Sequence, residues 1–284
     1  MQPDRDAVVF YRQAHEAQPE CADYARCVAV MLLNMGRHEE ALEAYLRVRT
    51  IDPTFMTASV LNEIGFLSNA LKGWKEALHY YRQAHEAEPG NPMYARNTGL
   101  AYKNTGDYQK AIEFFRKTKE LDPDYFAADT ENQFGSCQAE IGNWDEALNH
   151  YRKAYELDTK EPAYTYNVGM AYRQIENCAD ALIFFQKTIE QDPSFSPAAV
   201  QNNIGLCWEQ TGGWGEAQLH YLKAHELDPK DPAYSRNVGI SHMRNGRLKE
   251  AVEFFSKTRS LDPDYMASNI EELIQDCERK LAEE

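Results

Sequence analysis

One pattern restricts what this chain can fold into more than any other: a helical hairpin is rewritten seven times, and 34-residue units alternate with 36-residue units. Most hairpins end in proline, in two series of the same constant step: Pro53, Pro123, Pro193 and Pro263, and Pro19, Pro89 and Pro229 with Thr159 in the remaining place. A repeat of this length buries its apolar face only against its neighbours. The sequence therefore predicts an elongated solenoid rather than a globular enzyme.

Each hairpin has recognisable start and stop signals. In the unit that spans residues 92–123, Asn91 is expected to cap the first helix, with Pro92 at the first helical position, where no N–H is needed. Asp231–Pro232 and Ser196–Pro197 predict the same arrangement. Gly106 is expected to end the first helix, because glycine tolerates the left-handed backbone of a helix terminus. The equivalent glycines are Gly36, Gly142, Gly212 and Gly246.

Small residues recur inside the first helices, where glycine costs on the order of 1 kcal/mol relative to alanine. These positions are Ala29, Gly65, Gly99, Gly135, Gly169, Gly205 and Gly239. We expect them to face alanines of the second helices, such as Ala111, with large aromatic residues such as Phe115 and Phe185 filling the space beside each small pair. The recurrence predicts close packing of the two helices in each hairpin.

The order of glycine, aromatic, alanine, aromatic and proline in seven units resembles the tetratricopeptide repeat. The resemblance covers the whole chain. It implies an all-α fold, a right-handed superhelical solenoid of helix–turn–helix repeats that binds partners on a concave surface lined by the first helices. We interpret residues 1–284 as a single solenoid domain: 4–21 as the unpaired second helix of a partial repeat, 22–264 as seven helical hairpins, and 265–284 as a C-terminal capping helix.

The two ends are predicted to differ. Residues 4–18 match only a second helix, so no first helix covers Val8, Val9 and Phe10. Either upstream residues are absent or this edge meets another chain, which would make a homo-oligomer through residues 4–18. The last helix carries an apolar face and a charged face, as a terminal cap requires. The apolar face comprises Ile270, Leu273, Ile274, Cys277 and Leu281.

Composition excludes several classes of partner. Thirty Lys and Arg against 45 Asp and Glu give a net charge of −15, which would repel phosphate backbones, so no nucleic acid is expected. The N-terminal stretch lacks the apolar run of a signal peptide, and no stretch is long enough to span a membrane. We therefore expect a cytoplasmic protein with no membrane partner. Six cysteines without a CxxC pair predict buried free thiols, with neither a metal site nor a disulfide framework.

No set of residues departs from the repeat in the way that an active site must. His15, His85 and His225 recur in step with the prolines, and Tyr155 takes the remaining place, which is typical of a packing aromatic. The sequence therefore predicts no enzyme, no catalytic residue, no cofactor and no metal.

Two series of asparagines on the first helices are the candidate binding residues. Asn97, Asn167 and Asn237 stand two residues before the helix glycine, and Asn62, Asn132 and Asn202 stand three before it. A side-chain amide is both donor and acceptor, so a regular row of amides can hold the backbone of an extended peptide. The first series is similar to the asparagine ladder of tetratricopeptide regions that bind extended chains. The second lies about 100° round the helix from it. Alternatively, the amides tie neighbouring helices together, or duplication alone copied them.

Charges on the first helices alternate with the repeat. The 34-residue units carry Arg96, Lys103, Arg173 and Arg236, and the 36-residue units carry Glu63, Glu140 and Glu209. A basic stripe would favour an acidic or C-terminal segment, although solvated surface charge explains each residue singly. We predict a non-enzymatic scaffold or adaptor that binds an extended, partly acidic peptide in its concave groove. Two alternatives stay open: a self-assembling platform through the N-terminal edge, and the regulatory region of a separate enzyme.

Overall fold

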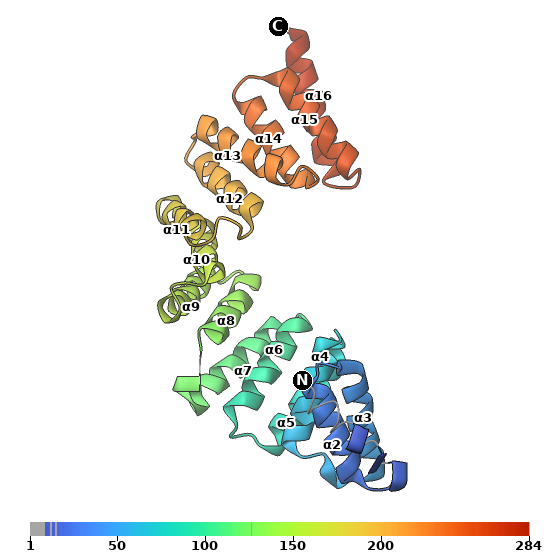
Figure 1. Ribbon diagram of the computed structural model, residues 1–284. Helices are drawn as coiled ribbons and strands as arrows, with labels where there is room; N and C mark the ends of the chain where they lie inside the picture. Colours follow the sequence, from blue (N-terminus) through green and yellow to red (C-terminus); the bar gives the residue numbers. More distant parts are fainter. Residues whose placement is uncertain (1–8, 12, 15, 126, 284) are drawn as a thin grey trace. The chain divides into compact units, whose positions relative to one another are not determined.

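The computed structural model describes residues 9–283 except 12, 15 and 126, and within these ranges it contains helices and no strand (Figure 1). By its internal contacts the chain divides into two compact units, Met1–Gly142 and Asn143–Glu284. The repeated all-helical fold is as predicted. The continuity of one solenoid domain across residue 142 stays a prediction.

Unit 1 opens with helical backbone among residues 9–17 and continues as alternating first and second helices. Its helices are α2 (Ala22–Asn34), α3 (His38–Ile51), α4 (Ala58–Ala70), α5 (Trp74–Ala87), α6 (Pro92–Asn104), α7 (Tyr108–Leu121) and α8 (Ala128–Glu140). Short 3-10 turns at Pro53–Phe55 and Pro123–Tyr125 follow α3 and α7. The pairs α2/α3, α4/α5 and α6/α7 pack as antiparallel hairpins (Figure 1).

Unit 2 repeats this plan with a second set of helices. They are α9 (Trp144–Leu157), α10 (Pro162–Gln174), α11 (Cys178–Gln191), α12 (Pro197–Gln210), α13 (Trp214–Leu227), α14 (Pro232–Arg244), α15 (Leu248–Leu261) and α16 (Ala267–Glu283). The pairs α10/α11, α12/α13 and α14/α15 form hairpins. With those of unit 1, these pairs correspond to six of the seven hairpins that the sequence predicts. The two helices of the fourth, α8 and α9, belong to different units, so their pairing stays a prediction.

The helix ends follow the predicted signals with one exception. The Asn91 side chain accepts a hydrogen bond from the Met93 N–H at 3.0 Å, and Asp231 accepts one from Ala233 at 2.7 Å. The prediction for Ser196 was wrong: this residue precedes α12 with a φ of 41°, and its side chain makes no capping bond. Gly106 ends α6 with a φ of 82°, in the left-handed region that favours glycine.

Glycines of the first helices lie directly against aromatic rings of the second. A Cβ added to Gly99 would stand 3.1 Å from the Phe115 ring, and one added to Gly239 would stand 2.6 Å from the Phe255 ring. Both phenylalanines are completely buried. Close packing at the glycines is confirmed, but the nearest neighbour is the ring itself rather than the alanine that the sequence analysis placed there.

The two ends of the chain differ as expected over the residues described. On α16, Ile270, Ile274 and Cys277 are buried against α15, with Leu273 and Leu281 packed around them. The predicted apolar face of the cap is therefore confirmed. At the other end, the side chains of Val9 and Phe10 are 54% and 64% exposed, and Val8 lies outside the described residues.

The cysteine prediction holds in part. Cys137, Cys178, Cys207 and Cys277 are buried free thiols. Cys21, the N-cap residue of α2, and Cys27, within α2, are only half-buried.

Candidate functional site

The two asparagine series meet as pairs between neighbouring first helices. The Asn97 Nδ2 of α6 donates to the Asn62 Oδ1 of α4 at 2.7 Å, and the Asn237 Nδ2 of α14 donates to the Asn202 Oδ1 of α12 at 2.7 Å. A one-residue difference in register therefore does not separate the two series. The same bonds agree with the alternative that these amides tie neighbouring helices together.

Each pair uses only part of its hydrogen-bonding capacity. A primary amide has two N–H donors and an oxygen with two lone pairs. Among the described residues, the Asn62 Nδ2 and the Asn97 Oδ1 make no other hydrogen bond, and neither atom is buried without a partner. The Asn62–Asn97 pair can therefore still offer a donor and an acceptor side by side. One peptide unit needs both to be satisfied.

The third predicted pair falls at the division of the chain. Asn132 lies on α8 in unit 1, and Asn167 lies on α10 in unit 2. That these two residues contribute to a peptide-binding site stays a prediction.

In unit 1 the amide pair borders a hollow of about 590 Å³ with an apolar side. Phe66 and Leu100 line it together with the two asparagines, and the Phe66 side chain is 47% exposed. Tyr81 also lines the hollow, and burial raises its pKa to about 12 although the nearby Arg96 opposes the shift. This phenol stays neutral at physiological pH. The full lining is Leu33, His38, Asn62, Glu63, Phe66, Asn69, Tyr81, Arg96, Asn97 and Leu100.

The basic residue of this hollow already has a carboxylate partner. The Arg96 Nη2 donates to the Asp129 Oδ2 at 2.6 Å, and its Nε donates to the Thr130 Oγ1 at 2.7 Å. Asp129 lies on α8, so the ion pair joins neighbouring first helices. A ligand carboxylate at Arg96 would have to compete with Asp129.

The equivalent arginine of unit 2 has amide partners instead. Arg236 contacts the Asn269 Oδ1 through Nε and Nη2 at 3.4 and 3.3 Å, and the Asn237 Oδ1 through Nη1 at 3.4 Å. Asn269 occupies the place in unit 2 that Asp129 holds in unit 1. No carboxylate among the described residues forms an ion pair with Arg236. Its charge is therefore available to an acidic ligand.

The other two predicted cations also differ. Lys103 on α6 donates to the Gln133 Oε1 on α8. Arg173 on α10 has a buried Nε with no hydrogen-bond partner among the described residues. It occupies the place of Leu33, which lines the hollow of unit 1. Unit 2 thus has an arginine at the repeat position that Leu33 and Lys103 hold in unit 1.

Two of the predicted acidic residues are held by tyrosines. Tyr45 donates its hydroxyl to Glu63, and Tyr221 donates to the Glu209 Oε2 at 2.5 Å. Burial first, and then the bound carboxylate, raises the pKa of both phenols. These glutamates therefore help to fix the helices and are less free to select a ligand than the sequence indicated. Glu140, the third, is the last residue of α8.

The repeated histidines are packing residues, as predicted. The ring centroids of His85 and Phe114 are 5.3 Å apart, and those of His225 and Phe254 are 5.6 Å apart, in edge-to-face geometry. His15 lies outside the described residues. Among the described residues, no three or more His, Cys, Asp or Glu form a cluster suited to a metal ion. None of the helices in the same residues is both long and apolar enough to cross a membrane.

Sequence reasoning missed two features of the site. One is Phe66, which it did not connect with ligand binding although an aromatic residue stood one position after the helix glycine. The other is the Asp129/Asn269 difference, which decides the partner of each arginine. Comparing the residues that start the next first helix after Arg96 and after Arg236 would have revealed it.

The comparisons with known proteins identify the class of this fold. A family model described as tetratricopeptide repeat matches residues 91–160, and another with the same description matches residues 5–54, 138–194 and 198–265. These matches cover more than half of the sequence, and the chain belongs to the tetratricopeptide repeat family. Proteins with this fold generally mediate protein–protein interaction and are generally not enzymes.

Individual relatives are distant. A probable UDP-N-acetylglucosamine–peptide N-acetylglucosaminyltransferase SPINDLY from Hordeum vulgare is 27% identical over 186 residues, which is 63% of this chain and 19% of that protein. The BBSome complex member BBS4 from Bos taurus is 24% identical over 91% of this chain and 49% of its own length. The chain spans about half or less of the length of the first curated relatives that it matches.

One solved structure is similar over nearly the whole chain. The hetero-tetramer Cut9–Hcn1 of the APC/C aligns with a TM-score of 0.65 at 14% identity, over 96% of this chain and 52% of that one. This likeness supports the fold alone.

Proposed function

We propose that this protein is a non-enzymatic scaffold or adaptor whose first helices bind an extended peptide segment of a partner protein. The amide pairs would hold the peptide backbone, one peptide unit at each pair. A segment bound at unit 1 would be apolar, and a segment bound at unit 2 would be acidic.

The observation that carries the proposal is the repeated amide pair. The Asn62–Asn97 and Asn202–Asn237 pairs have the same donor, acceptor and length in two units. In unit 1 the pair borders a hollow where Phe66 is exposed, so a backbone contact and a side-chain contact lie together. Main-chain hydrogen bonds with side-chain pockets beside them are how extended peptides are generally recognised.

The proposed acidic preference rests on unit 2. Arg236 has no ion-pair partner among the described residues, whereas Arg96 in unit 1 pairs with Asp129. A cation held by neutral oxygens attracts a ligand carboxylate more strongly than one already neutralised, because no bond must first break. The sequence predicts acidic selection at Arg96 and Arg236 alike. We now propose it for Arg236, with Arg173 beside the same groove.

The test is a screen against an array of extended peptides of varied charge. The chain should capture a subset, and a triple Asn97/Asn167/Asn237→Ala variant that keeps its helical circular dichroism should lose that capture. Asn104→Ala is the matched control, because the Asn104 Nδ2 also donates to an amide of α4, the Asn69 Oδ1, at 2.8 Å. If the triple variant captures the same peptides as the unaltered chain, the amide pairs do not bind the peptide backbone.

Self-assembly through residues 4–18 is the second candidate function. It is supported by the exposure of Val9 and Phe10, which are apolar side chains open to solvent at one edge. Light scattering over a range of concentrations would decide it, since a monomer at the highest concentration contradicts self-assembly. We further propose a cytoplasmic location, to be tested with a fluorescent fusion. The third reading, a regulatory region of an enzyme, is supported only by the partial match to the SPINDLY protein.

A further inference from the structure

One ring position of the repeat is empty in the first hairpin only. In the second helix, the residue just before the buried aromatic carries a ring in six hairpins: Tyr80, Phe114, His150, Phe184, His220 and Phe254. In the first hairpin the same position is Ala44.

In the third and seventh hairpins, which are also 34-residue hairpins, this ring packs between two other rings. The Phe114 centroid is 5.3 Å from that of His85 on the preceding second helix and 5.4 Å from that of Tyr102 on its own first helix. Phe254 lies in the same way between His225, at 5.6 Å, and His242, at 5.5 Å. The phenylalanine is thus part of the seam between successive repeats.

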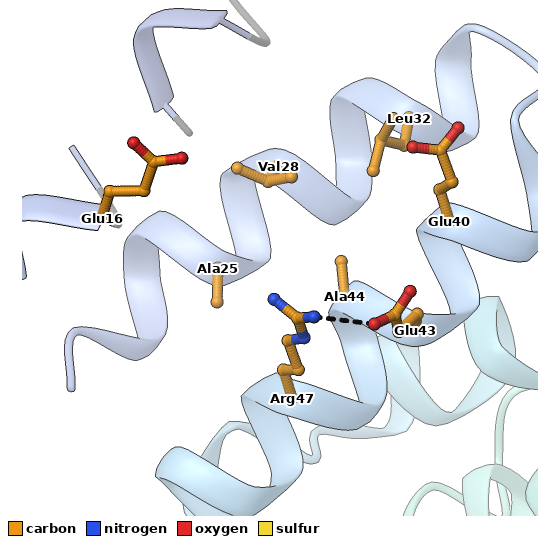
Figure 2. A pocket seen from close by; sticks show the side chains of 8 residues that line it. All are labelled: Glu16, Ala25, Val28, Leu32, Glu40, Glu43, Ala44 and Arg47. Carbon is orange, nitrogen blue, oxygen red and sulfur yellow. Dashed lines mark hydrogen bonds and ion pairs between the residues drawn. The ribbon is translucent and has the colours of Figure 1, made fainter. Parts of the chain in front are cut away.

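Ala44 lines a cavity of about 300 Å³ (Figure 2). Val28 and Leu32 of α2 and Ala44 of α3 give it apolar walls, and these three side chains are buried. Leu32 stands where Tyr102 and His242 stand in the later hairpins, so a second ring is also missing. The volume is at the lower end of the range of about 300–1,000 Å³ that is typical of ligand pockets. No residue that lines it belongs to the amide groove.

The edge of the cavity is acidic. Among the described residues, Glu16, Glu40 and Glu43 line it together with one cation, Arg47, which donates to the Glu43 Oε1 at 2.7 Å (Figure 2). Arg37, outside the lining, donates from its Nε to the Glu40 Oε1 at 2.6 Å. The described lining is therefore acidic, in a protein of net charge −15.

We propose that this cavity is a second binding site, which takes the aromatic side chain of a partner peptide with a basic residue next to it. The partner's ring would occupy the place that Phe114, Phe184 and Phe254 occupy from within the chain. Its basic neighbour would meet the glutamates at the edge. The site is separate from the proposed peptide groove and does not depend on it.

The test follows the methyl NMR signals of Val28 and Leu32 in the full chain during titration with the peptide acetyl-lysyl-phenylalanyl-lysinamide. The proposal expects saturable shifts at these two residues and none with the alanine analogue of the peptide. The analogue with glutamates in place of lysines should bind several-fold more weakly. No shift with the phenylalanine peptide overturns the site, and equal binding of the glutamate analogue overturns the basic neighbour.

Ala44→Phe is the decisive variant, because it gives the first hairpin the aromatic ring that the later hairpins have at this position. It should weaken the peptide about tenfold or more, because the cavity is then filled. Ala44→Leu tests the same point if the larger ring perturbs the fold, and Asn97→Ala should leave binding unchanged. Full binding by folded Ala44→Phe or Ala44→Leu contradicts the proposal. A second result would also contradict the proposal: light scattering that reports a dimer of the unaltered chain and a monomer of Ala44→Phe. The cavity would then be occupied by a second copy of this chain.

Discussion

Units 1 and 2 share the same framework of packed helices and differ in the side chains that this framework presents. Equivalent residues hold the same places in both: Gly99 and Gly239 against buried rings, and Asn97 and Asn237 in equal amide pairs. Single replacements change what the frame presents. Asp129 becomes Asn269, which frees an arginine from its ion pair. The comparison shows that the repeated positions carry the fold, and we propose that the positions which break the repeat set ligand selectivity.

The largest effect should come from removing the buried ring in either unit. Phe115→Ala and Phe255→Ala each delete a completely buried side chain next to a helix glycine. Each should lower the free energy of unfolding of its own unit by about 3–5 kcal/mol through the cavity it leaves. Urea unfolding followed by hydrogen exchange would report the two units separately.

Leu219→Ala is the control, because the Leu219 side chain is 69% exposed and should cost little. A cost below about 1 kcal/mol at Phe115 or Phe255 would contradict the shared core.

The next largest effect should be a loss of stability that differs between the two units. An alanine Cβ at residue 239 would lie 2.6 Å from the Phe255 ring, whereas one at residue 99 would lie 3.1 Å from the Phe115 ring. Gly239→Ala should therefore cost about 1–3 kcal/mol through overpacking, less the roughly 1 kcal/mol that alanine contributes to helix stability. Gly99→Ala should be closer to neutral. Thermal unfolding of both variants measures the difference, and equal melting temperatures would show that the two contacts do not differ in effect.

Much of the frame could be predicted from the sequence, because a repeat states each local rule several times. The six hairpins described above and the apolar face of α16 follow from proline, glycine and apolar spacing. The predicted cap at Ser196 was wrong because the left-handed backbone of this residue keeps its side chain from the capping position. The residue type alone does not reveal that backbone conformation. The Asn62–Asn97 pair depends on how neighbouring first helices are staggered, and the sequence specifies that stagger only through packing.

The third prediction exchanges the arginine environments. Asn269→Asp should give Arg236 the ion pair that Arg96 has, and should weaken binding of an acidic peptide by about 1 kcal/mol. Asp129→Asn should do the reverse in unit 1 and strengthen it by a similar amount. Fluorescence titration at two salt concentrations is the measurement, since a freed cation also increases the salt dependence. If both variants change affinity in the same direction, the ion pair of Arg96 does not control selection.

The smallest effect is a pH dependence that should be stronger in unit 2. Burial lowers the pKa of His220, His225 and His242 there, and of His85 in unit 1. On His225 and His85 a neighbouring lysine acts in the same direction, and nearby carboxylates oppose it. The folded pKa therefore lies below the ordinary value of about 6.5.

Between these two pKa values the unfolded chain binds more protons than the folded one, so stability that is present above about pH 6.5 is lost as the pH falls through this window. Among the described residues, unit 2 has three such histidines and unit 1 has one, so unit 2 should lose more. His225→Tyr, which introduces the ring that Tyr155 has at the equivalent place, should reduce the loss in unit 2. Hydrogen exchange on both sides of pH 6.5, corrected for the intrinsic exchange rate, measures the stability of each unit. An equal loss of stability in both units would contradict the proposed difference.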